Sequence, residues 1–244
     1  MASSDEKPGP MPGRDDGTTP GKALTVGQQV IDRGAQLMTT SMKPINNMSQ
    51  YFNTFGMYSH DMSRQIETHH FVSRLNQDFC QCAVYDSDLP SARLIGIVYI
   101  ISEKIFEGLP PDEQKLWHSH TYKIKAGLWN NPRVPGIIEN SELQTFAKMY
   151  GKFWCTWQVD RGDKLPLGAP ALMMSPQPES TICAEMVKKR DEKYQISSDN
   201  LISSRANIAP PENLNSYADH WKQSGKGFAI DIQEMEMKTT APLP

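Results

Sequence analysis

Hydrophobic and polar residues alternate with a period of two through the stretch from residue 53 to residue 101. This period is typical of β-strands, in which successive side chains point to opposite faces. Cys80, Cys82 and Val84 share one such face, and the octet 94–101 is apolar on both faces, as in the central strand of a sheet. The pattern therefore predicts a sheet over this part of the chain.

Two later segments alternate in the same way. In the first, one face carries His118, His120, Tyr122 and Ile124, and the other carries Ser119, Thr121, Lys123 and Lys125. Because the second face is polar and basic, we expect it to contact water and the two histidines to point inward. In the second, the apolar face consists of Phe153, Cys155, Trp157 and Val159. A last short strand is predicted over 228–232.

Helical patterns flank and interrupt these strands. Thr25 and Gln28 form a capping-box pair, which predicts a helix of about 14 residues after Thr25. Its apolar stripe consists of Val26, Val30, Ile31, Ala35, Leu37 and Met38. Further helices are predicted at 102–107, 141–150, 182–194 and 198–207. Strands interleaved with short helices, some joined by loops too short for a crossover helix, indicate an α+β fold with a mainly antiparallel sheet and short flanking helices.

Composition divides the 244 residues into one domain and two tails. Residues 1–22 contain eight glycines and prolines and no aromatic residue, so we expect a disordered N-terminal tail. The single domain is predicted over 23–235, and 236–244 form a C-terminal tail. The net charge is −3 and no run of five like charges occurs, so a nucleic-acid partner is not expected.

The chain shows no sequence sign of a membrane span or of secretion. Its longest apolar stretch, 94–101, is far shorter than the roughly 20 residues that a transmembrane helix needs. The N-terminus lacks the basic and apolar regions of a secretory signal, and Ala2 stands where myristoylation needs a glycine. The four cysteines are too scattered for a disulfide framework, so we expect free thiols and a cytosolic chain.

Histidines are the candidate functional residues. If the segment 66–73 is a strand, His69 and His70 point to opposite faces, so only one of them can join His118 and His120. We interpret these residues, with Tyr122, as lining a polar pocket in the core. A metal site is the alternative, with Asp61, Glu67 or Asp160 as further ligands, but no spacing selects among them and no His-Glu-x-x-His motif is present. We therefore expect neither a metal nor a cofactor.

Several specific blocks of sequence occur together. They are His60–Met62, Arg64–Glu67, His69–His70, Gln81–Asp86, Ala92–Gly96, Leu116–His120, Trp157–Asp163, Leu165–Gly168 and Leu172–Ser175. In combination they resemble the oil body-associated proteins, and the resemblance covers about residues 25–232. The C-terminal part, with Asp219–Lys222, is similar to the second plant subgroup of that family.

The resemblance implies association with seed oil bodies, which are triacylglycerol droplets coated by a phospholipid monolayer, and a part in droplet size and stability. It implies no reaction and supplies no catalytic residues. The chain lacks the long apolar hairpin of oleosins, so attachment must be peripheral, to the droplet surface or to its coat proteins, with the protein shared between droplets and cytosol. The alternative is an enzyme or small-ligand carrier that uses the histidine-lined pocket.

Two segments are candidates for the lipid contact. The first is the helix that follows Thr25, although its polar face is rich in glutamine rather than in lysine and arginine, and such a helix can equally pack on its own domain. The second is a loop whose apolar side chains are Leu165, Leu167, Leu172, Met173 and Met174. Flexible methionines suit adaptable contact surfaces, but a loop that caps the sheet would use the same residues.

Overall fold

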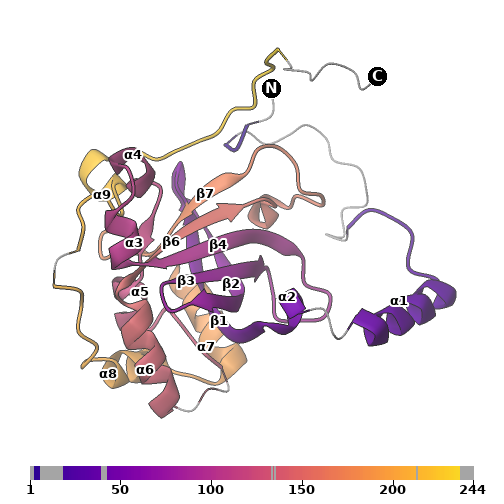
Figure 1. Cartoon of the computed structure of the whole chain (residues 1–244), viewed down its shortest axis with the longest axis horizontal. Helices are drawn as coiled ribbons and strands as arrows, with labels where there is room; N and C mark the ends of the chain where they lie inside the picture. Colours follow the sequence, from indigo (N-terminus) through magenta and orange to yellow (C-terminus); the bar gives the residue numbers. More distant parts are fainter. Residues whose placement is uncertain are drawn as a thin grey trace.

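The computed structural model describes residues 3–5, 19–39, 43–132, 134, 136–212 and 214–236 (Figure 1). Most of the predicted N-terminal tail and the predicted C-terminal tail from residue 237 onward lie outside these residues. None of the described helices is long and apolar enough to cross a membrane.

Antiparallel strands form the centre of the molecule. They are β1 (Met48–Tyr58), β2 (Asp61–Asn76), β3 (Phe79–Tyr85), β4 (Leu94–Ser102), β5 (His118–Ser119), β6 (Met149–Cys155) and β7 (Ala171–Met174). The first four pair in sequence; β4 then pairs with β6, β6 with β7, and β7 with β1. The short β5 pairs with β6 alongside β7. The predicted α+β class and antiparallel sheet are confirmed, but the sheet closes into a barrel.

The register places one face of each strand inside the barrel. Phe52 pairs with His70 across neighbouring strands, and His70 pairs with Val84. The same ring of paired residues around the barrel continues to Gly96 and Cys155. A second ring joins Val72, Cys82, Val98, Phe153 and Met173. These rings form the core, and the predicted shared face of Cys80, Cys82 and Val84 is confirmed because all three side chains are buried.

A glycine allows the barrel to close between β4 and β6. A Cβ atom on Gly96 would overlap the carbonyl oxygen of Trp154 and lie 2.7 Å from the Phe153 ring. Any side chain here would push the two strands apart, because one neighbour is the backbone of β6 and the other is a ring of the packed core. Gly96 thus fixes the close approach that turns an open sheet into a barrel.

Short helices cover one end of the barrel (Figure 1). The helices are α1 (Val26–Thr39), α2 (Lys43–Asn46), α3 (Glu103–Glu107), α4 (Pro111–Gln114), α5 (Thr121–Lys125), α6 (Gly136–Phe146), α7 (Ala184–Tyr194), α8 (Ser198–Ser204) and α9 (Trp221–Ser224), with a 3-10 turn η1 (Val159–Arg161). The helices predicted at 102–107, 182–194 and 198–207 are confirmed. The one predicted at 141–150 begins and ends earlier, as α6.

Two strand predictions need correction. β6 ends at Cys155, so Trp157 is partly buried beyond the strand, where its Nε1 donates to the carbonyl of Asp163 at 2.7 Å. The segment predicted as a last strand is extended, but it makes only an isolated bridge between Asp231 and Ser3 among the described residues. A period of two is therefore not sufficient for a strand where no neighbouring edge is available.

The two ends of the described chain meet beside the barrel. The amide of Ser4 donates to the carbonyl of Ile230 at 2.9 Å, and the amide of Ile230 donates to Ser4 Oγ at 2.8 Å. Gln158 Nε2 donates to the carbonyl of Ser4 at 2.7 Å. Ser3 and Ser4 are consequently buried. Residues 6–18 of the predicted tail lie outside the described part, so the disorder of the tail stays a prediction.

Candidate functional site

The structure brings three of the predicted pocket histidines together and places His69 on the other face of its strand. His70 lies inside the barrel, where it meets His118 on β5 and His120 just before α5. His69, the next residue on β2, points to the outer face, as strand geometry requires. Tyr122 lies on α5, is partly exposed and is not among the side chains that line the inner chamber.

The inner chamber is closed and small. Its polar walls are Thr54, Thr68, His70, His118, His120, Lys123 and Ser175, and its cavity of about 10 Å³ has room for about one water molecule. His70 Nε2 lies 2.9 Å from Thr68 Oγ1, and the His70 ring stacks on Phe52 at 4.4 Å between centroids. The Nδ1 atoms of the three histidines, Thr54 Oγ1 and Ser175 Oγ have no hydrogen-bond partner in the described part of the chain.

Lys123 is the residue that the sequence placed on the wrong side. The chain turns from strand to helix at His120, whose φ of −105° and ψ of −15° are helical, so the period of two ends there. As a result Lys123 is only 4% exposed, and its Nζ lies 5.1 Å from the centre of the Trp129 ring. The prediction that Lys123 faces water is wrong, and Tyr122, which was expected inside, takes a partly exposed position.

Burial sets the charge of the inner chamber. It lowers the pKa of Lys123 to about 7. Burial also holds the pKa values of His70, His118 and His120 well below the ordinary value, and the nearby Lys123 charge adds to this effect. The three imidazoles are therefore neutral at physiological pH.

Gly151 on β6 provides the space for two of these imidazoles. A Cβ atom at this position would lie 2.5 Å from His120 Nε2 and 2.7 Å from His118 Nε2. In the sequence this glycine reads only as the end of a helix. Its role became visible only with the strand pairing that places His118 opposite Gly151.

Metal binding is not supported by the arrangement of side chains. Within the described ranges, no three His, Cys, Asp or Glu side chains are arranged to hold a metal ion. Asp160, one of the carboxylates considered, is instead paired with Arg64 at 2.7 Å. Glu67, another, lies outside the barrel with its Oε1 3.6 Å from His69 Nε2.

On the outer face, His69 begins a chain of hydrogen bonds. Its Nδ1 lies 2.8 Å from the Tyr51 hydroxyl, which lies 2.9 Å from the Tyr194 hydroxyl. Tyr194 donates to Asp88 Oδ2 at 3.0 Å, and Lys193 Nζ donates to Asp88 Oδ1 at 2.6 Å. Burial lowers the pKa of His69 to about 4, so this histidine is neutral as well.

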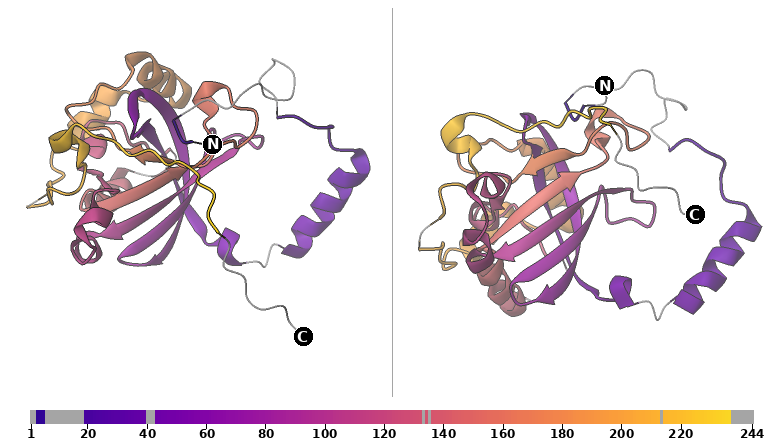
Figure 2. Two further views of the ribbon diagram at one scale, coloured as in Figure 1. Left: turned by 90° about the horizontal axis from the view of Figure 1, so that it is seen from above. Right: turned by 45° about the horizontal axis from the view of Figure 1, so that its top comes forward.

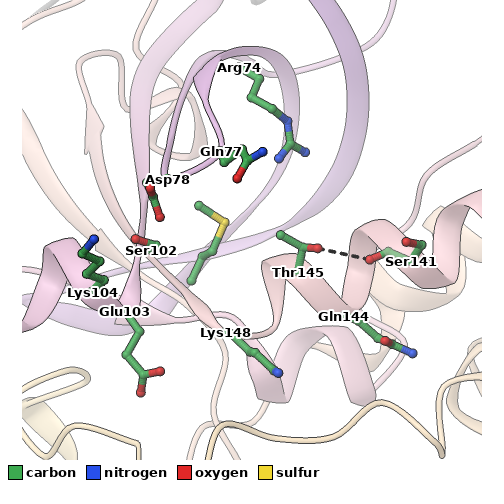
Figure 3. A pocket seen from close by; sticks show the side chains of 11 residues that line it. Arg74, Gln77, Asp78, Ser102, Glu103, Lys104, Ser141, Gln144, Thr145 and Lys148 are labelled. Atoms are coloured by element: carbon green, nitrogen blue, oxygen red, sulfur yellow. Dashed lines mark hydrogen bonds between the residues drawn. The ribbon is translucent and has the colours of Figure 1, made fainter.

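A cavity of about 620 Å³ is an open polar cleft (Figure 3). Arg74, Asp78, Glu103, Lys104 and Lys148 line it, and all five charged side chains are partly or fully exposed. Arg74 is already paired with Glu142 at 2.6 Å. Because positive and negative groups are mixed and solvated, we assign no site to this cleft.

The predicted lipid-contact loop is mostly inaccessible. Leu172, Met173 and Met174 form β7 between β1 and β6, and all three side chains are buried. The prediction that they contact lipid is therefore wrong, because the barrel needs them as a strand. Leu165 and Leu167 lie in the preceding loop, are partly exposed and remain a predicted contact.

The predicted helix after Thr25 is present but does not pack on the domain. The capping box forms: the amide of Gln28 donates to Thr25 Oγ1 at 3.2 Å, and the amide of Thr25 donates to Gln28 Oε1 at 2.9 Å. Val26, Val30 and Ile31 are 64% to 77% exposed. Three views show α1 standing clear of the barrel (Figures 1 and 2). The side chains of Leu37 and Met38, also in the predicted stripe, lie outside the described part.

Comparison with known proteins identifies the family. Over its full length the chain is 53% identical to "Oil body-associated protein 2A" of Zea mays and 55% identical to "Oil body-associated protein 2A" of Arabidopsis thaliana, both also covered in full. It is 38% identical to "Oil body-associated protein 1B" of Arabidopsis thaliana over 90% of each chain. No solved structure matches. A family model described as a protein of unknown function (DUF1264) matches residues 42–209. The chain thus belongs to the oil body-associated protein family, as its sequence blocks predict.

Proposed function

We propose that this protein attaches peripherally to lipid droplets through α1 and helps to keep them small and stable without catalysing a reaction. The names of its relatives support the association with oil bodies. The observation that carries the proposal is the exposed apolar stripe of α1. A soluble helix normally turns such a stripe toward its own domain.

The geometry of α1 suits a helix lying in an interface. At ~100° per residue, Val26, Val30 and Ile31 fall within a sector of ~140°, whereas Gln29 and Asp32 lie well outside it. Burying one such aliphatic side chain in an apolar phase contributes about 1.5 to 3 kcal/mol. Three of them offset part of the loss of freedom on binding, which supports reversible attachment.

The charges of α1 favour an apolar rather than an electrostatic mode of attachment. Asp32 and Arg33 cancel, and the other polar residues of the helix are uncharged. An anionic surface would therefore gain little attraction for the helix. We expect attachment to depend weakly on ionic strength and strongly on the apolar side chains.

The test is flotation with artificial droplets of triolein coated by phosphatidylcholine. Val30→Asp should reduce the floating fraction at least tenfold, because a charge then lies within the stripe. The matched control, Gln29→Asp, makes a comparable charge change one residue away on the polar face and should float like the original protein. Equal flotation of both variants, or no flotation of the original protein on protein-free droplets, would contradict direct attachment through α1.

The effect on droplet size is tested separately. Light scattering should show slower coalescence of the same droplets when the original protein is added than when Val30→Asp is added. Leu165→Asp with Leu167→Asp probes the second predicted contact in the same assay. A loss of flotation in that variant alone would move the attachment site from α1 to this loop.

A further inference from the structure

Two adjoining cavities form a groove on the outer face of the barrel, beside α2. The first, of about 310 Å³, is lined by Tyr51, Phe71, Asp88, Pro132 and Tyr194. The second, of about 470 Å³, is lined by Ile45, Met48, Phe71, Tyr85, Ser87, Asp88, Leu89, Pro90 and Ala92. Because Phe71 and Asp88 belong to both walls, we treat the two cavities as one outer groove. Each volume is in the range of small-molecule sites.

The walls of the outer groove are apolar and incompletely covered. Phe71 contacts Tyr51 and Tyr85 at 5.1 and 5.4 Å between ring centroids, which gives a continuous aromatic floor. At the rim, Ile45 is 72% exposed and Leu89 is 61% exposed. An aromatic floor with aliphatic side chains standing at its edge suits a flexible hydrocarbon chain.

The outer groove has a polar end, formed by Asp88 and Tyr194, and this end determines which ligand charge fits. Lys193 and Asp88 neutralise each other through the contact at 2.6 Å, so neither sign of charge is favoured. A carboxylate ligand would in addition approach the carboxylate of Asp88. An uncharged head group therefore fits this end best.

The hydrogen-bond roles at this end select the head group further. Tyr194 has one hydroxyl proton and donates it to Asp88, which as a carboxylate can only accept. With its proton on Asp88, the Tyr194 hydroxyl accepts from the Tyr51 hydroxyl at 2.9 Å. What remains for a ligand at this end is therefore lone pairs, those of the Asp88 carboxylate and the second one of Tyr194. A head group that donates a hydrogen bond, such as an alcohol, is complementary to these lone pairs. A head group that has only ester oxygens is not, because it can only accept.

We propose that the outer groove binds a single-chain, uncharged amphiphile with a hydroxyl head group, of the monoacylglycerol type. The chain lies over Phe71 and Tyr85 toward Ile45, and the hydroxyl head donates to Asp88 and Tyr194. This binding goes beyond attachment to droplets and does not require it. The proposed attachment only supplies a source, because Ile45 follows the end of α1 by a span of at most ~20 Å of extended chain.

Binding is tested in solution with short-chain probes below their aggregation concentration. Titration calorimetry with 1-decanoylglycerol should give one site per chain, and decanoate and methyl decanoate should bind at least tenfold more weakly. Ala92→Trp should weaken all three at least tenfold by filling the groove. Tyr194→Phe keeps the ring but removes the hydroxyl, so it should weaken only 1-decanoylglycerol. Lys148→Gln, in the open polar cleft, should change nothing.

The absence of saturable binding would overturn the proposal. Unchanged binding by folded Ala92→Trp would move the site elsewhere, and equal affinities for the three probes would overturn the head-group assignment. Should Ala92→Trp fail to fold, Leu89→Asp introduces a charge at the exposed rim and serves the same purpose. Failure of droplet attachment is distinguishable, because Val30→Asp should still bind 1-decanoylglycerol and Ala92→Trp should still float.

Discussion

Helix α1 and the inner chamber depart from the usual placement of side chains in opposite ways: α1 exposes apolar side chains, and the chamber buries polar and basic ones. On α1, Val26 is 77% exposed, whereas in the chamber the ammonium-bearing Lys123 is only 4% exposed. The exposed stripe contributes nothing to folding, because it is hydrated in the folded and the unfolded state alike. The buried lysine opposes folding, because its charged form loses water on burial, and the imidazoles oppose folding in acid, where the unfolded state is protonated and the buried rings are not.

This difference assigns the two regions to different measurements. Changes in α1 should alter binding to a surface without altering the free energy of unfolding. Changes in the chamber should alter the free energy of unfolding and its dependence on pH. The comparison fails if changes in α1 alter the free energy of unfolding, or if changes in the chamber alter binding to a surface.

Acid should produce the largest effect, through the chamber. His70, His118 and His120 have folded-state pKa values well below 6.5, so as the pH falls below 6.5 these three residues bind up to three more protons in the unfolded state than in the native state. Each contributes a loss of about 1.4 kcal/mol per pH unit, or about 4 kcal/mol together. His69, outside the chamber, adds to the effect because its pKa is lowered to about 4. Below about pH 6, Asp219 offsets the effect of one histidine on stability. Burial raises the pKa of Asp219 to about 6, so the native state binds this proton at a higher pH than the unfolded state does.

The measurement is chemical denaturation between pH 7 and pH 5. His118→Asn should reduce the slope of stability against pH by about 1.4 kcal/mol per pH unit. His220→Gln, outside the chamber, should leave the slope unchanged. A chamber whose histidines are already protonated in the native state would show the same slope for all three proteins.

Lys123→Met should stabilise the protein at pH 7, by about 1 to 4 kcal/mol on the scale seen when buried charges are replaced by apolar side chains. In the original protein the unfolded lysine keeps its proton between pH 7 and about 10.5 while the buried lysine loses it, so stability should rise with pH in this window. Lys123→Met should lose this rise. The exposed Lys148→Met is the control, and an identical pH profile in both variants would mean that Lys123 is solvated.

Replacing a glycine by alanine, which adds one methyl group, should have different effects in the inner chamber and in α1. Gly151→Ala places a Cβ atom against the His118 and His120 rings and should lower the free energy of unfolding by about 1 to 3 kcal/mol. Gly34→Ala, in α1, meets nothing within 4 Å and should leave barrel unfolding unchanged while raising helix content. Circular dichroism and denaturation midpoints check both, and equal midpoints would place Gly151 outside the packed chamber.

The smallest effect on stability is expected from the stripe itself. Ile31→Asp should change the free energy of barrel unfolding by less than about 0.5 kcal/mol, because the side chain is exposed and contacts no core residue. The same variant should lose droplet binding. A drop in the melting temperature of several degrees would show that α1 packs on the barrel in solution.

Local sequence was sufficient for the hairpins and for the helix after Thr25. In β3, for example, every second residue is buried, because one face of the strand points into the barrel core and the other points outward. Closure of the barrel was not predictable, since β4 pairs with β6 across the intervening helices and the sequence signal of each is local. Whether α1 packs was equally undetermined, because an amphipathic stripe looks the same whether its partner is protein or lipid.

The candidate site was half predictable for a similar reason. Strand parity correctly sent His118 inward and separated His69 from His70. It failed at Lys123 because β5 has only two residues before α5 begins, and the residues from Thr121 onward are compatible with either a strand or a helix. In the folded chain Lys123 Nζ lies 5.1 Å from the centre of the Trp129 ring, a contact that no sequence period reveals.

The docking of Ser3 and Ser4 beside the C-terminal segment has a mechanical consequence for α1. The helix is not a free tail: the chain is anchored to the barrel on one side of it by Ser4 and on the other side by β1. A tether fixed at two points limits both the reach and the rotation of the barrel relative to whatever α1 holds, and a single proteolytic cut on the N-terminal side leaves the β1 anchor intact. With α1 on a droplet surface, as proposed, two chain segments rather than one would connect the barrel to that surface.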